Sequence, residues 1–295
     1  MLLPLLESLR PRQWTKNVFV FAALVFDHKL FRPEYFLVTL AAFGIFCLLS
    51  GAVYLLNDLA DADADRQHPT KRKRPIASGR LPIRVAQAAG VALPLVALPL
   101  GFWLDWRFGL VAVAYFGENL LYSTWLKRKA ILDVLLLALG FVLRVAAGVV
   151  VVDVQRFSPW LYICVTLLAL FLGFGKRRHE LVLMAGQGNP TRHSLDEYNL
   201  PLLDTMITIV TTAVIMAYSL YTFSAHGLPV NDSMMLTIPF VLYGIFRYLY
   251  LIHVRGEGGA PDELLLHDRP LQATVVLWGL TIITLMYLFQ FPLRP

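Results

Sequence analysis

The chain has 295 residues, of which 57% are hydrophobic and only 16% are charged, and its formal net charge is +6 at pH 7. Soluble globular domains average about 45–50% apolar and about 25% charged residues. This composition excludes a disordered chain, a coiled coil and an ordinary soluble enzyme, and it favours a membrane protein with several spans.

Nine segments predict membrane-spanning helices, because each approaches the roughly 20 predominantly apolar residues that a span needs. The first is the weakest, since Lys16 and Asn17 open it. We expect an all-α polytopic membrane helical bundle of nine transmembrane helices, forming a single integral membrane domain over residues 1–295. The predicted spans are 14–31, 35–56, 83–104, 108–126, 131–152, 157–175, 203–225, 234–253 and 271–290.

The distribution of Lys and Arg predicts how these spans are oriented. With the N-terminus in the cytoplasm, 19 of the 26 Lys and Arg residues fall in cytoplasmic segments, 5 fall on the opposite side, and Arg144 and Arg247 lie within spans. Cytoplasmic loops carry the excess of positive residues in membrane proteins. We therefore expect an integral plasma (inner) membrane protein with its N-terminus and polar links in the cytoplasm and its C-terminus outside.

An acidic cluster follows the second predicted span. Asp58, Asp61 and Asp65 are spaced i, i+3 and i+7, which places them on one face of a helix, whereas Asp63 points elsewhere. Hard oxygen ligands suit Mg²⁺, which prefers one or two carboxylates plus substrate phosphates. The alternative is a solvated acidic helix end, although charges at this side of a membrane are usually basic.

A basic loop at residues 66–79 comes next, with five cations among the nine residues from Arg66 to Arg74. Pro75 and Gly79 bracket a turn that can hold this loop over a site. A metal-bound diphosphate needs carboxylates for the metal and Arg or Lys side chains for the outer oxygens. The alternative is a positive anchor on anionic lipid.

The pattern Asn-Asp-x-x-Asp-x-x-x-Asp from Asn57 to Asp65, followed by the basic loop and Arg74-Pro75, resembles the first aspartate-rich motif of the UbiA-type superfamily. Members of that superfamily are intramembrane prenyltransferases of nine helices. The resemblance covers essentially the whole chain, and it implies the same number of helices as the spans counted above.

Typical members of the superfamily carry a second motif, Asp-x-x-x-Asp, after the sixth span. The corresponding link of this chain has three bases at 176–178 followed by one acid, Glu180. A site with this excess of positive charge favours substrates that carry more negative charge than one metal-bound diphosphate does. A second substrate that bears a phosphate would provide this additional negative charge. Anchoring by the positive-inside rule is the alternative explanation.

Four short motifs together resemble the decaprenyl-phosphate phosphoribosyltransferase branch of this superfamily. They are Arg-Pro-Arg-Gln-Trp-Thr-Lys-Asn at 10–17, His-Pro-Thr-Lys-Arg at 68–72, Lys-Arg-x-x-Glu-Leu at 176–181 and Asp-Arg-Pro-Leu at 268–271. The resemblance implies Mg²⁺-dependent transfer of 5-phosphoribosyl from phosphoribosyl diphosphate to polyprenyl (decaprenyl) monophosphate. Diphosphate is released, and the product is a precursor of the arabinose donors for cell-wall arabinan.

Under this resemblance the candidate site residues fall into three groups. The expected Mg²⁺ ligands are Asp58, Asp61 and Asp65. The expected catalytic residues are Asp58, Asp61, Lys176, Arg177, Glu180 and Tyr198. The expected substrate-binding residues are Gln13, Lys16, Asn17, Asn57, Lys71, Arg72, Arg74, Tyr122, Lys127, Arg144 and Arg192.

Within the third group, Gln13, Lys16 and Asn17 are expected along the access path of the acceptor, and Lys71, Arg72 and Arg74 on the donor phosphates. Lys176, Arg177 and Arg192 are expected on the 5-phosphate or the lipid phosphate, with Glu180 on metal or ribose hydroxyls and Tyr198 orienting the sugar.

The chemistry under this resemblance rests on charge. Departure of the diphosphate builds negative charge on the leaving group and an oxocarbenium-like centre at C1 of the ribose, and Mg²⁺ and cations stabilise the former. The acceptor phosphate is already an anion at pH 7, so catalysis rests on positioning rather than on a strong base.

Several alternatives stay open from the sequence alone. One rival is a UbiA-type prenyltransferase that moves an isoprenyl chain to an aromatic acceptor, and another is a transporter or scaffold that binds cations. Glu118 and Arg144 form either a functional or a structural pair, and an acidic group at Asp262, Glu263 and Asp268 either supplies a second metal or caps the site. We expect membrane lipid and no nucleic acid as a partner, and the sequence leaves a homo-oligomer open.

Overall fold

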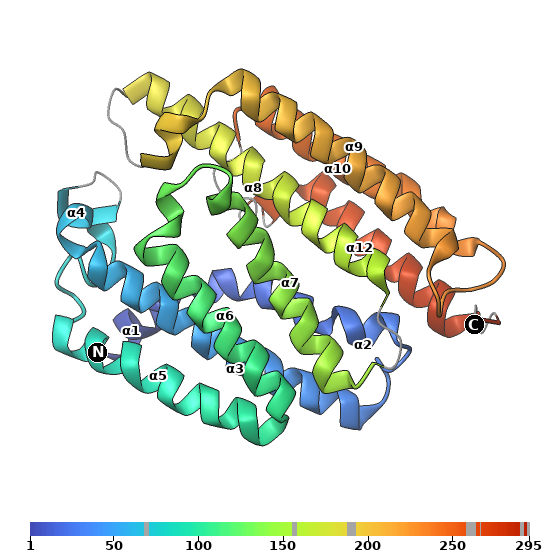
Figure 1. Cartoon of the computed structure of the whole chain (residues 1–295), viewed down its shortest axis with the longest axis horizontal. Coiled ribbons are helices and arrows are strands. Elements are labelled where there is room, and N and C mark those ends of the chain that lie inside the picture. Colours follow the sequence, from blue (N-terminus) through green and yellow to red (C-terminus); the bar gives the residue numbers. More distant parts are fainter. Residues whose placement is uncertain are drawn as a thin grey trace. The chain divides into compact units, whose positions relative to one another are not determined.

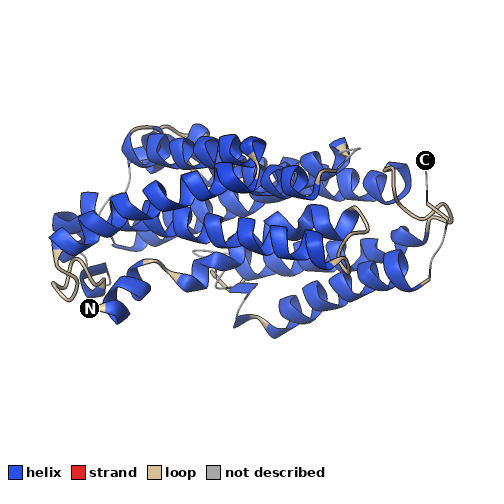
Figure 2. Ribbon diagram, turned by 90° about the horizontal axis from the view of Figure 1, so that it is seen from below, coloured by secondary structure: helices blue, strands red, loops and turns tan. Residues whose placement is uncertain are grey.

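A computed structural model describes residues 1–67, 71–154, 158–187, 193–257, 264–265, 267–289 and 292–293. This part of the chain is helical with short connecting loops, and its one isolated bridge joins Pro229 to Leu293 (Figures 1 and 2). The chain divides into two compact units, which we describe separately. The helices α2 (Ala22–Phe26) and α7 (Leu132–Val152) contribute residues to both.

Unit 1 comprises residues 1–24, 29–124 and 143–154. Its core forms where α3 (Pro33–Ala60) packs against α5 (Ile83–Leu104) and α6 (Trp106–Thr124), and where α5 packs against α6. Phe46 and Tyr115 lie in this core with their ring centroids 4.8 Å apart. The other elements of unit 1 are α1 (Leu2–Ser8), η1 (Pro11–Phe21), α4 (Ala62–Gln67) and η2 (Lys71–Lys73).

A glycine allows the backbone of η1 to approach α7 within unit 1. A Cβ atom at Gly148 would collide with the carbonyl oxygen of Val20, whose side chain is itself completely buried. The small residue therefore sets the distance between the two segments, as is common between helices in membranes.

Unit 2 comprises residues 25–28, 125–142 and 155–295. Its main core is built on α8 (Pro159–Gln187) and α9 (Leu200–Ser224), which pack along each other, and includes Phe171 and Tyr248 with ring centroids 5.1 Å apart. The other elements of unit 2 are η3 (Leu126–Arg128), η4 (His193–Glu197), η5 (Ser233–Thr237), α10 (Ile238–His253), α12 (Arg269–Ile283) and the π-helical turn η6 (Thr284–Leu288).

The described residues contain seven helices that are long and apolar enough to cross a membrane. They correspond to seven of the nine predicted spans. The predicted span 108–126 is helical as α6 but is not among the seven, and the predicted span 14–31 is a 3₁₀ helix followed by the five-residue α2. The weak first span is irregular where Asn17 turns inward and forms hydrogen bonds with side chains of the core.

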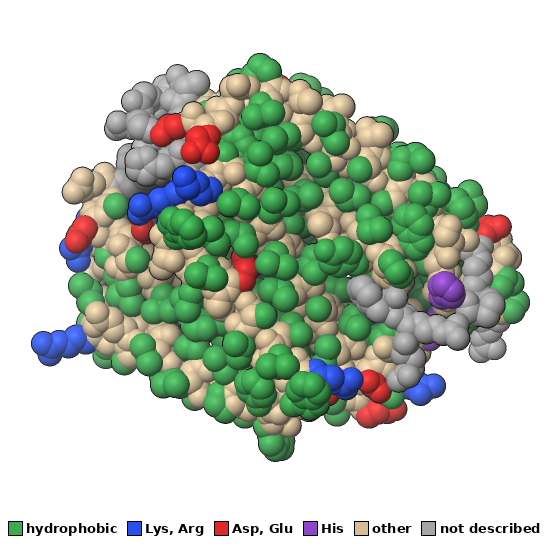
Figure 3. All heavy atoms as spheres, in the orientation of Figure 1, with side chains coloured by type: hydrophobic (Ala, Val, Ile, Leu, Met, Phe, Trp, Pro, Cys, Tyr) green, Lys and Arg blue, Asp and Glu red, His purple; other side chains and the backbone are tan. Residues whose placement is uncertain are grey.

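The surface fits a chain that lies in lipid. Hydrophobic side chains cover most of the face shown in Figure 3. Large apolar residues are strongly exposed on the spans, for example Leu95 on α5, Ile209 on α9 and Val276 on α12. Exposed apolar patches of this extent are rare on soluble monomers, so we take the protein to be an integral membrane protein.

Candidate functional site

The acidic cluster of unit 1 lies where α3 passes into α4. The helix is interrupted at Asp61, whose φ and ψ are −97° and 5°, yet the N–H of Asp65 still donates to the carbonyl of Asp61 at 2.8 Å. Asp58 and Asp65 are both buried. The predicted helical spacing therefore brings these two carboxylates to one site despite the break.

Arg74 joins the two buried carboxylates. Its Nη1 atom donates to Oδ1 of Asp58 at 3.1 Å and to Oδ2 of Asp65 at 2.6 Å. Two carboxylate groups within reach of one nitrogen form a pocket of concentrated negative potential, which a cation stabilises.

Arg10 is a second cation at this site, and no pattern in the sequence predicts that it lies here. Its Nη2 atom donates to Oδ1 of Asp58 at 2.5 Å, and its guanidinium carbon lies 4.8 Å from the ring centroid of Tyr54. Arg10 has a φ of 52°, in the left-handed region that residues other than glycine rarely adopt. Its position directly before Pro11 in a polar stretch was the signal available in the sequence.

The basic loop is folded by a turn at its end, as predicted from Pro75 and Gly79. The N–H of Leu81 donates to the carbonyl of Pro75 at 2.9 Å, and Gly79 has a φ of 77°. The turn directs Arg74 to the carboxylates, while Arg80 forms a bidentate ion pair with Glu7 of α1 at 2.7 and 2.9 Å.

The other predicted donor ligands in the basic loop have different surroundings. Lys71 is half-buried at the start of η2, and Arg72 is exposed.

Asp63 is largely exposed and pairs with Arg66 at 2.6 Å, so the expectation that it points away from the cluster is confirmed.

The donor set fits a divalent cation only in part. The described residues contain no group of three His, Cys, Asp or Glu side chains arranged to hold a metal ion. Asp58 and Asp65 share one cationic nitrogen, whereas Asp61 is half-buried at the break between the helices. The pair offers hard oxygen donors, which suit Mg²⁺ together with substrate phosphates and with one further carboxylate.

A polar cluster lies inside the apolar part of unit 1. Arg144 donates from Nε to Oδ1 of Asn17 at 2.8 Å and from Nη2 to the hydroxyl of Tyr115 at 2.8 Å. Asn17 also donates to Cys47 and to Ser50, each at 3.3 Å.

The cluster changes the expectation for the access path of the acceptor. Asn17 is completely buried and is a structural partner of Arg144 rather than a lining residue. Gln13 and Lys16 are half-buried on the same segment and hydrogen bond to each other. Glu118 accepts from the side chain of Asn119 at 2.8 Å, and its pairing with Arg144 stays a prediction.

Unit 2 carries its own buried polar centre, which is organised by Asp133. The completely buried Arg177 donates from Nε to Oδ2 of Asp133 at 2.6 Å and from Nη1 to Oε2 of Glu180 at 2.5 Å. The hydroxyl of Tyr198 donates to Oδ1 of Asp133 at 3.0 Å and accepts from the N–H of Ile131 at 2.6 Å.

This geometry defines what Tyr198 can do chemically. Burial raises the pKa of its hydroxyl well above the ordinary value, and the carboxylate of Asp133 adds to this rise. Tyr198 is therefore a neutral hydrogen-bond donor at physiological pH. Since its hydroxyl already makes two hydrogen bonds within the protein, it orients protein groups rather than acting as a base.

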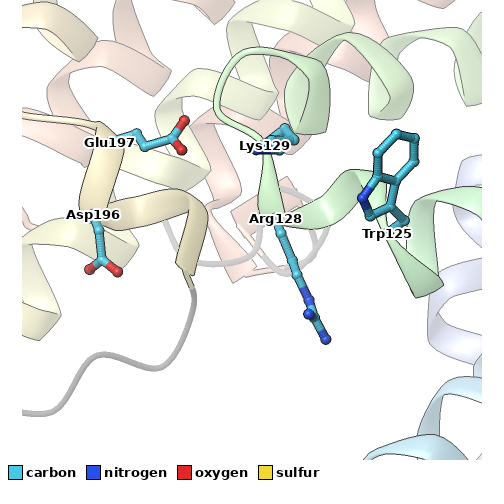
Figure 4. A pocket seen from close by; sticks show the side chains of 5 residues that line it. All are labelled: Trp125, Arg128, Lys129, Asp196 and Glu197. Carbon is cyan, nitrogen blue, oxygen red and sulfur yellow. The ribbon is translucent and has the colours of Figure 1, made fainter.

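A cavity of about 510 Å³ opens beside this centre in unit 2. Figure 4 shows its lining, with one side formed by the link that follows α6 and the other by η4. The N–H of Ala130 donates across to Oε2 of Glu197 at 3.3 Å. The lining residues are Trp125, Arg128, Lys129, Asp196 and Glu197.

Comparison with known proteins decides the family. Residues 17–267 match the UbiA prenyltransferase family. The chain belongs to the UbiA prenyltransferase family. It is 35% identical to the decaprenyl-phosphate phosphoribosyltransferase of Corynebacterium glutamicum over 96% of this chain and 87% of the relative. It is 36% identical to the enzyme of the same name from Mycolicibacterium smegmatis over 96% of this chain and 92% of the relative.

A solved structure supports the same fold. A UbiA homologue from Archaeoglobus fulgidus, bound to GPP and Mg²⁺, has a TM-score of 0.72 and 17% identity, with 96% of this chain and 99% of the homologue covered. This likeness places the helices of our chain in the UbiA fold.

The remaining predicted residues of this UbiA-family protein occupy varied places. Tyr122, Lys127 and Lys176 are half-buried, and Asn57 is half-buried one helical turn before Asp61. Outside the described residues lie Arg192 and the basic-loop residues at 68–70, together with Asp262 and Glu263 of the predicted acidic group.

Asp268, the third member of that acidic group, has a structural role. It caps α12 by accepting from the N–H of Leu271 at 2.9 Å, and it pairs with Arg247 at 2.7 Å. The hydrogen bond from Arg247 lowers the pKa of Asp268 below its ordinary value. Its two oxygens are thus engaged by Arg247 and by the first turn of α12.

Proposed function

We propose that this UbiA-family protein transfers a 5-phosphoribosyl group from phosphoribosyl diphosphate to a polyprenyl monophosphate and releases diphosphate. The observation that carries the proposal is similarity at 35–36% identity over 96% of the chain to relatives named decaprenyl-phosphate phosphoribosyltransferase. Support comes from the link at 176–180, where bases replace the second acidic motif of prenyltransferases and suit two phosphorylated substrates.

The proposed metal is Mg²⁺, held by Asp58 and Asp65 with Asp61 completing the set and Asn57 in support. When bound, it would neutralise charge on the departing diphosphate. The pair already binds the guanidinium of Arg74, so the electrostatics of the site are those a cation requires. In this proposal Arg74, Lys71 and Arg72 bind the phosphates of the donor.

Further residues are proposed, from the sequence, to bind the donor sugar and the acceptor. Lys176 and Arg192 provide positive charge for the 5-phosphate or the lipid phosphate, and Lys127 provides it for the diphosphate. Glu180 accepts hydrogen bonds from ribose hydroxyls, and Arg177 orients it through the ion pair of 2.5 Å. The acceptor phosphate is an anion at neutral pH, so it attacks C1 of the ribose without a general base, and catalysis depends on alignment.

The membrane arrangement is part of the proposal. We propose nine membrane segments, which add the irregular 14–31 segment and α6 to the seven apolar helices. The excess of Lys and Arg supports a cytoplasmic N-terminus and an external C-terminus in the plasma membrane. The proposed product serves synthesis of cell-wall arabinan.

Radiolabelled phosphoribosyl diphosphate tests the function in membranes that contain the protein. We expect label in a chloroform-soluble product only when polyprenyl phosphate and Mg²⁺ are both added. A parallel assay uses labelled isoprenyl diphosphate and an aromatic acceptor. Transfer of label in that assay alone would identify the rival prenyltransferase. No turnover in either assay would favour a transporter or scaffold.

The metal assignment is tested with a matched pair of variants in the same assay. Asp58→Asn removes a buried carboxylate of the acidic cluster, and we expect at least about a hundredfold loss of transfer, the scale of a lost transition-state charge contact. Asp63→Asn makes the same chemical change at an exposed position nearby, and we expect nearly unchanged activity. Equal activities of the two variants contradict the assignment.

A further inference from the structure

Asp133 is buried with both carboxylate oxygens engaged, at the start of α7. Oδ2 accepts from Arg177 and Oδ1 accepts from Tyr198, at 2.6 and 3.0 Å. A buried carboxylate pays a large desolvation cost that only such complete hydrogen bonding offsets. Arg177 and Tyr198 in turn each contact another part of unit 2.

One series of hydrogen bonds runs from Asp133 through Tyr198 to the backbone of Ile131. Ile131 has a φ of 67°, a left-handed conformation that β-branched residues strongly disfavour. Its N–H donates to the hydroxyl of Tyr198 at 2.6 Å, and the same hydroxyl donates to Asp133. Strained residues persist where their surroundings hold them, and they concentrate at functional sites.

The strained turn terminates the basic link 127–129, which follows α6 and precedes α7. Two successive N–H groups at its end donate hydrogen bonds. That of Ala130 donates to the carboxylate of Glu197 at 3.3 Å, and that of Ile131 donates to the hydroxyl of Tyr198. The same link forms one wall of the 510 Å³ cavity of unit 2. The position of its cations therefore depends on the hydroxyl of Tyr198.

A second series of contacts runs from Asp133 through Arg177 to Glu180. Arg177 has no exposed surface, so its guanidinium is fixed by Asp133 on one edge. From that fixed position Nη1 reaches Glu180, whose side chain keeps 26% exposure. A long charged side chain that is held in this way loses little additional freedom when it orients a neighbour.

We propose that Asp133 is a positioning residue that orders two donor-binding elements of unit 2 at once, the basic link through Tyr198 and the Glu180 carboxylate through Arg177. The proposal rests on the proposed function for the identity of the ligand, whereas the ordering of the link is a property of the protein alone. The two parts are therefore measured separately.

Trypsin cleavage after Lys127, Arg128 and Lys129 reports the ordering of the link directly. The full-length protein in detergent is digested briefly, and the fragments are quantified by mass spectrometry. Tyr198→Phe removes both hydrogen bonds of the hydroxyl and keeps the ring. We expect cleavage in the link to accelerate about tenfold, because local opening then lacks those bonds.

Tyr218→Phe is the matched control. Tyr218 is also buried in unit 2, and its hydroxyl also forms two hydrogen bonds, with Thr237 and Trp278, each at 2.7 Å. We expect its cleavage rate in the link to stay within about twofold of the wild type. Equal acceleration in both variants overturns the proposal, because general loosening of unit 2 then explains the result.

Steady-state kinetics of the same variants test the consequence for the donor. We expect Tyr198→Phe to raise the KM for phosphoribosyl diphosphate about fivefold or more, a larger factor than its effect on the KM for polyprenyl phosphate or on the kcat. An opened link with an unchanged donor KM overturns the positioning role. If the wild type does not use this donor, the proposed function fails, and the ordering of the link still stands or falls by the proteolysis.

Asp133→Asn provides a second test of the same centre. The amide keeps the size of the side chain but removes the charge and one of the two acceptor oxygens, so Arg177 and Tyr198 can no longer both donate to it. We expect faster cleavage in the link and a raised donor KM together. If this variant does not fold because the buried Arg177 loses its buried counter-charge and keeps only the partly exposed Glu180, Tyr198→Phe carries the test.

Discussion

Replacing Arg74 by Gln removes the guanidinium that Asp58 and Asp65 share. Both carboxylates are buried, with side-chain exposures of 3% and 4%, and Arg74 itself is 29% exposed. Removing one member of a buried ion pair costs about 3–5 kcal/mol. We expect the lower end, about 3 kcal/mol, because Arg10 still pairs with Asp58 at 2.5 Å and Arg74 is partly solvated.

Thermal unfolding in detergent, followed by intrinsic tryptophan fluorescence, measures this cost. For a chain of this size about 3 kcal/mol corresponds to a lowering of the Tm by roughly 6–12 °C. Arg72→Gln is the matched control, because Arg72 lies two residues away and is exposed, and we expect its Tm to be close to that of the wild type. The double variant Asp65→Asn with Arg74→Gln should recover part of the loss, since it removes an uncompensated charge.

Two results would refute this reasoning. One is an Arg74→Gln variant no less stable than Arg72→Gln, which would mean that the shared guanidinium contributes nothing to the folded state. The other is a double variant whose loss equals the sum of the single losses, which would mean that Arg74 and Asp65 do not interact.

Two further predictions concern packing and pH. Gly148→Ala places a methyl group against the carbonyl oxygen of Val20, and we expect the free energy of unfolding to fall by about 1–3 kcal/mol, measured by thermal unfolding. Gly44→Ala is the control, because a Cβ atom there has nothing within 4 Å, and it should be neutral or slightly stabilising. Equal stabilities of the two variants would contradict the close approach of Val20 to Gly148. The depressed pKa of Asp268 gives stability that is complete above the ordinary pKa of an aspartate, about 3.9, and is lost as the pH falls through the lower folded value. Asp268→Asn should therefore show a smaller loss of Tm than the wild type on acidification from pH 5 to below 4, and parallel pH profiles would show that the pair with Arg247 does not stabilise the fold.

Local periodicity predicted a large part of the fold and of the acidic cluster. Seven predicted spans correspond to helices that qualify as membrane spans, because a long apolar run dictates a helix in lipid whatever surrounds it. Asp58 and Asp65 meet because they lie seven residues apart on nearly continuous helix, a spacing that is visible in sequence.

Contacts between distant segments account for what the sequence did not predict. Arg10 reaches Asp58 across 48 residues, and Asp133 meets Arg177 across 44 and Tyr198 across 65. No periodic pattern encodes such pairs, since they depend on tertiary packing. The place of Asn17 depends on tertiary packing as well, because an amide in a weak span gives no sign of whether it faces a ligand or a buried arginine.

The cations at the acidic cluster have a consequence for assembly of the protein. Asp58 and Asp65 receive positive charge from Arg10 and Arg74, which belong to the same chain. In small metal-dependent domains the free energy of metal binding is the free energy of folding, so chelators unfold them. Here two arginines of the same polypeptide provide the counter-charge, so unit 1 can fold during insertion into the membrane before a metal ion binds.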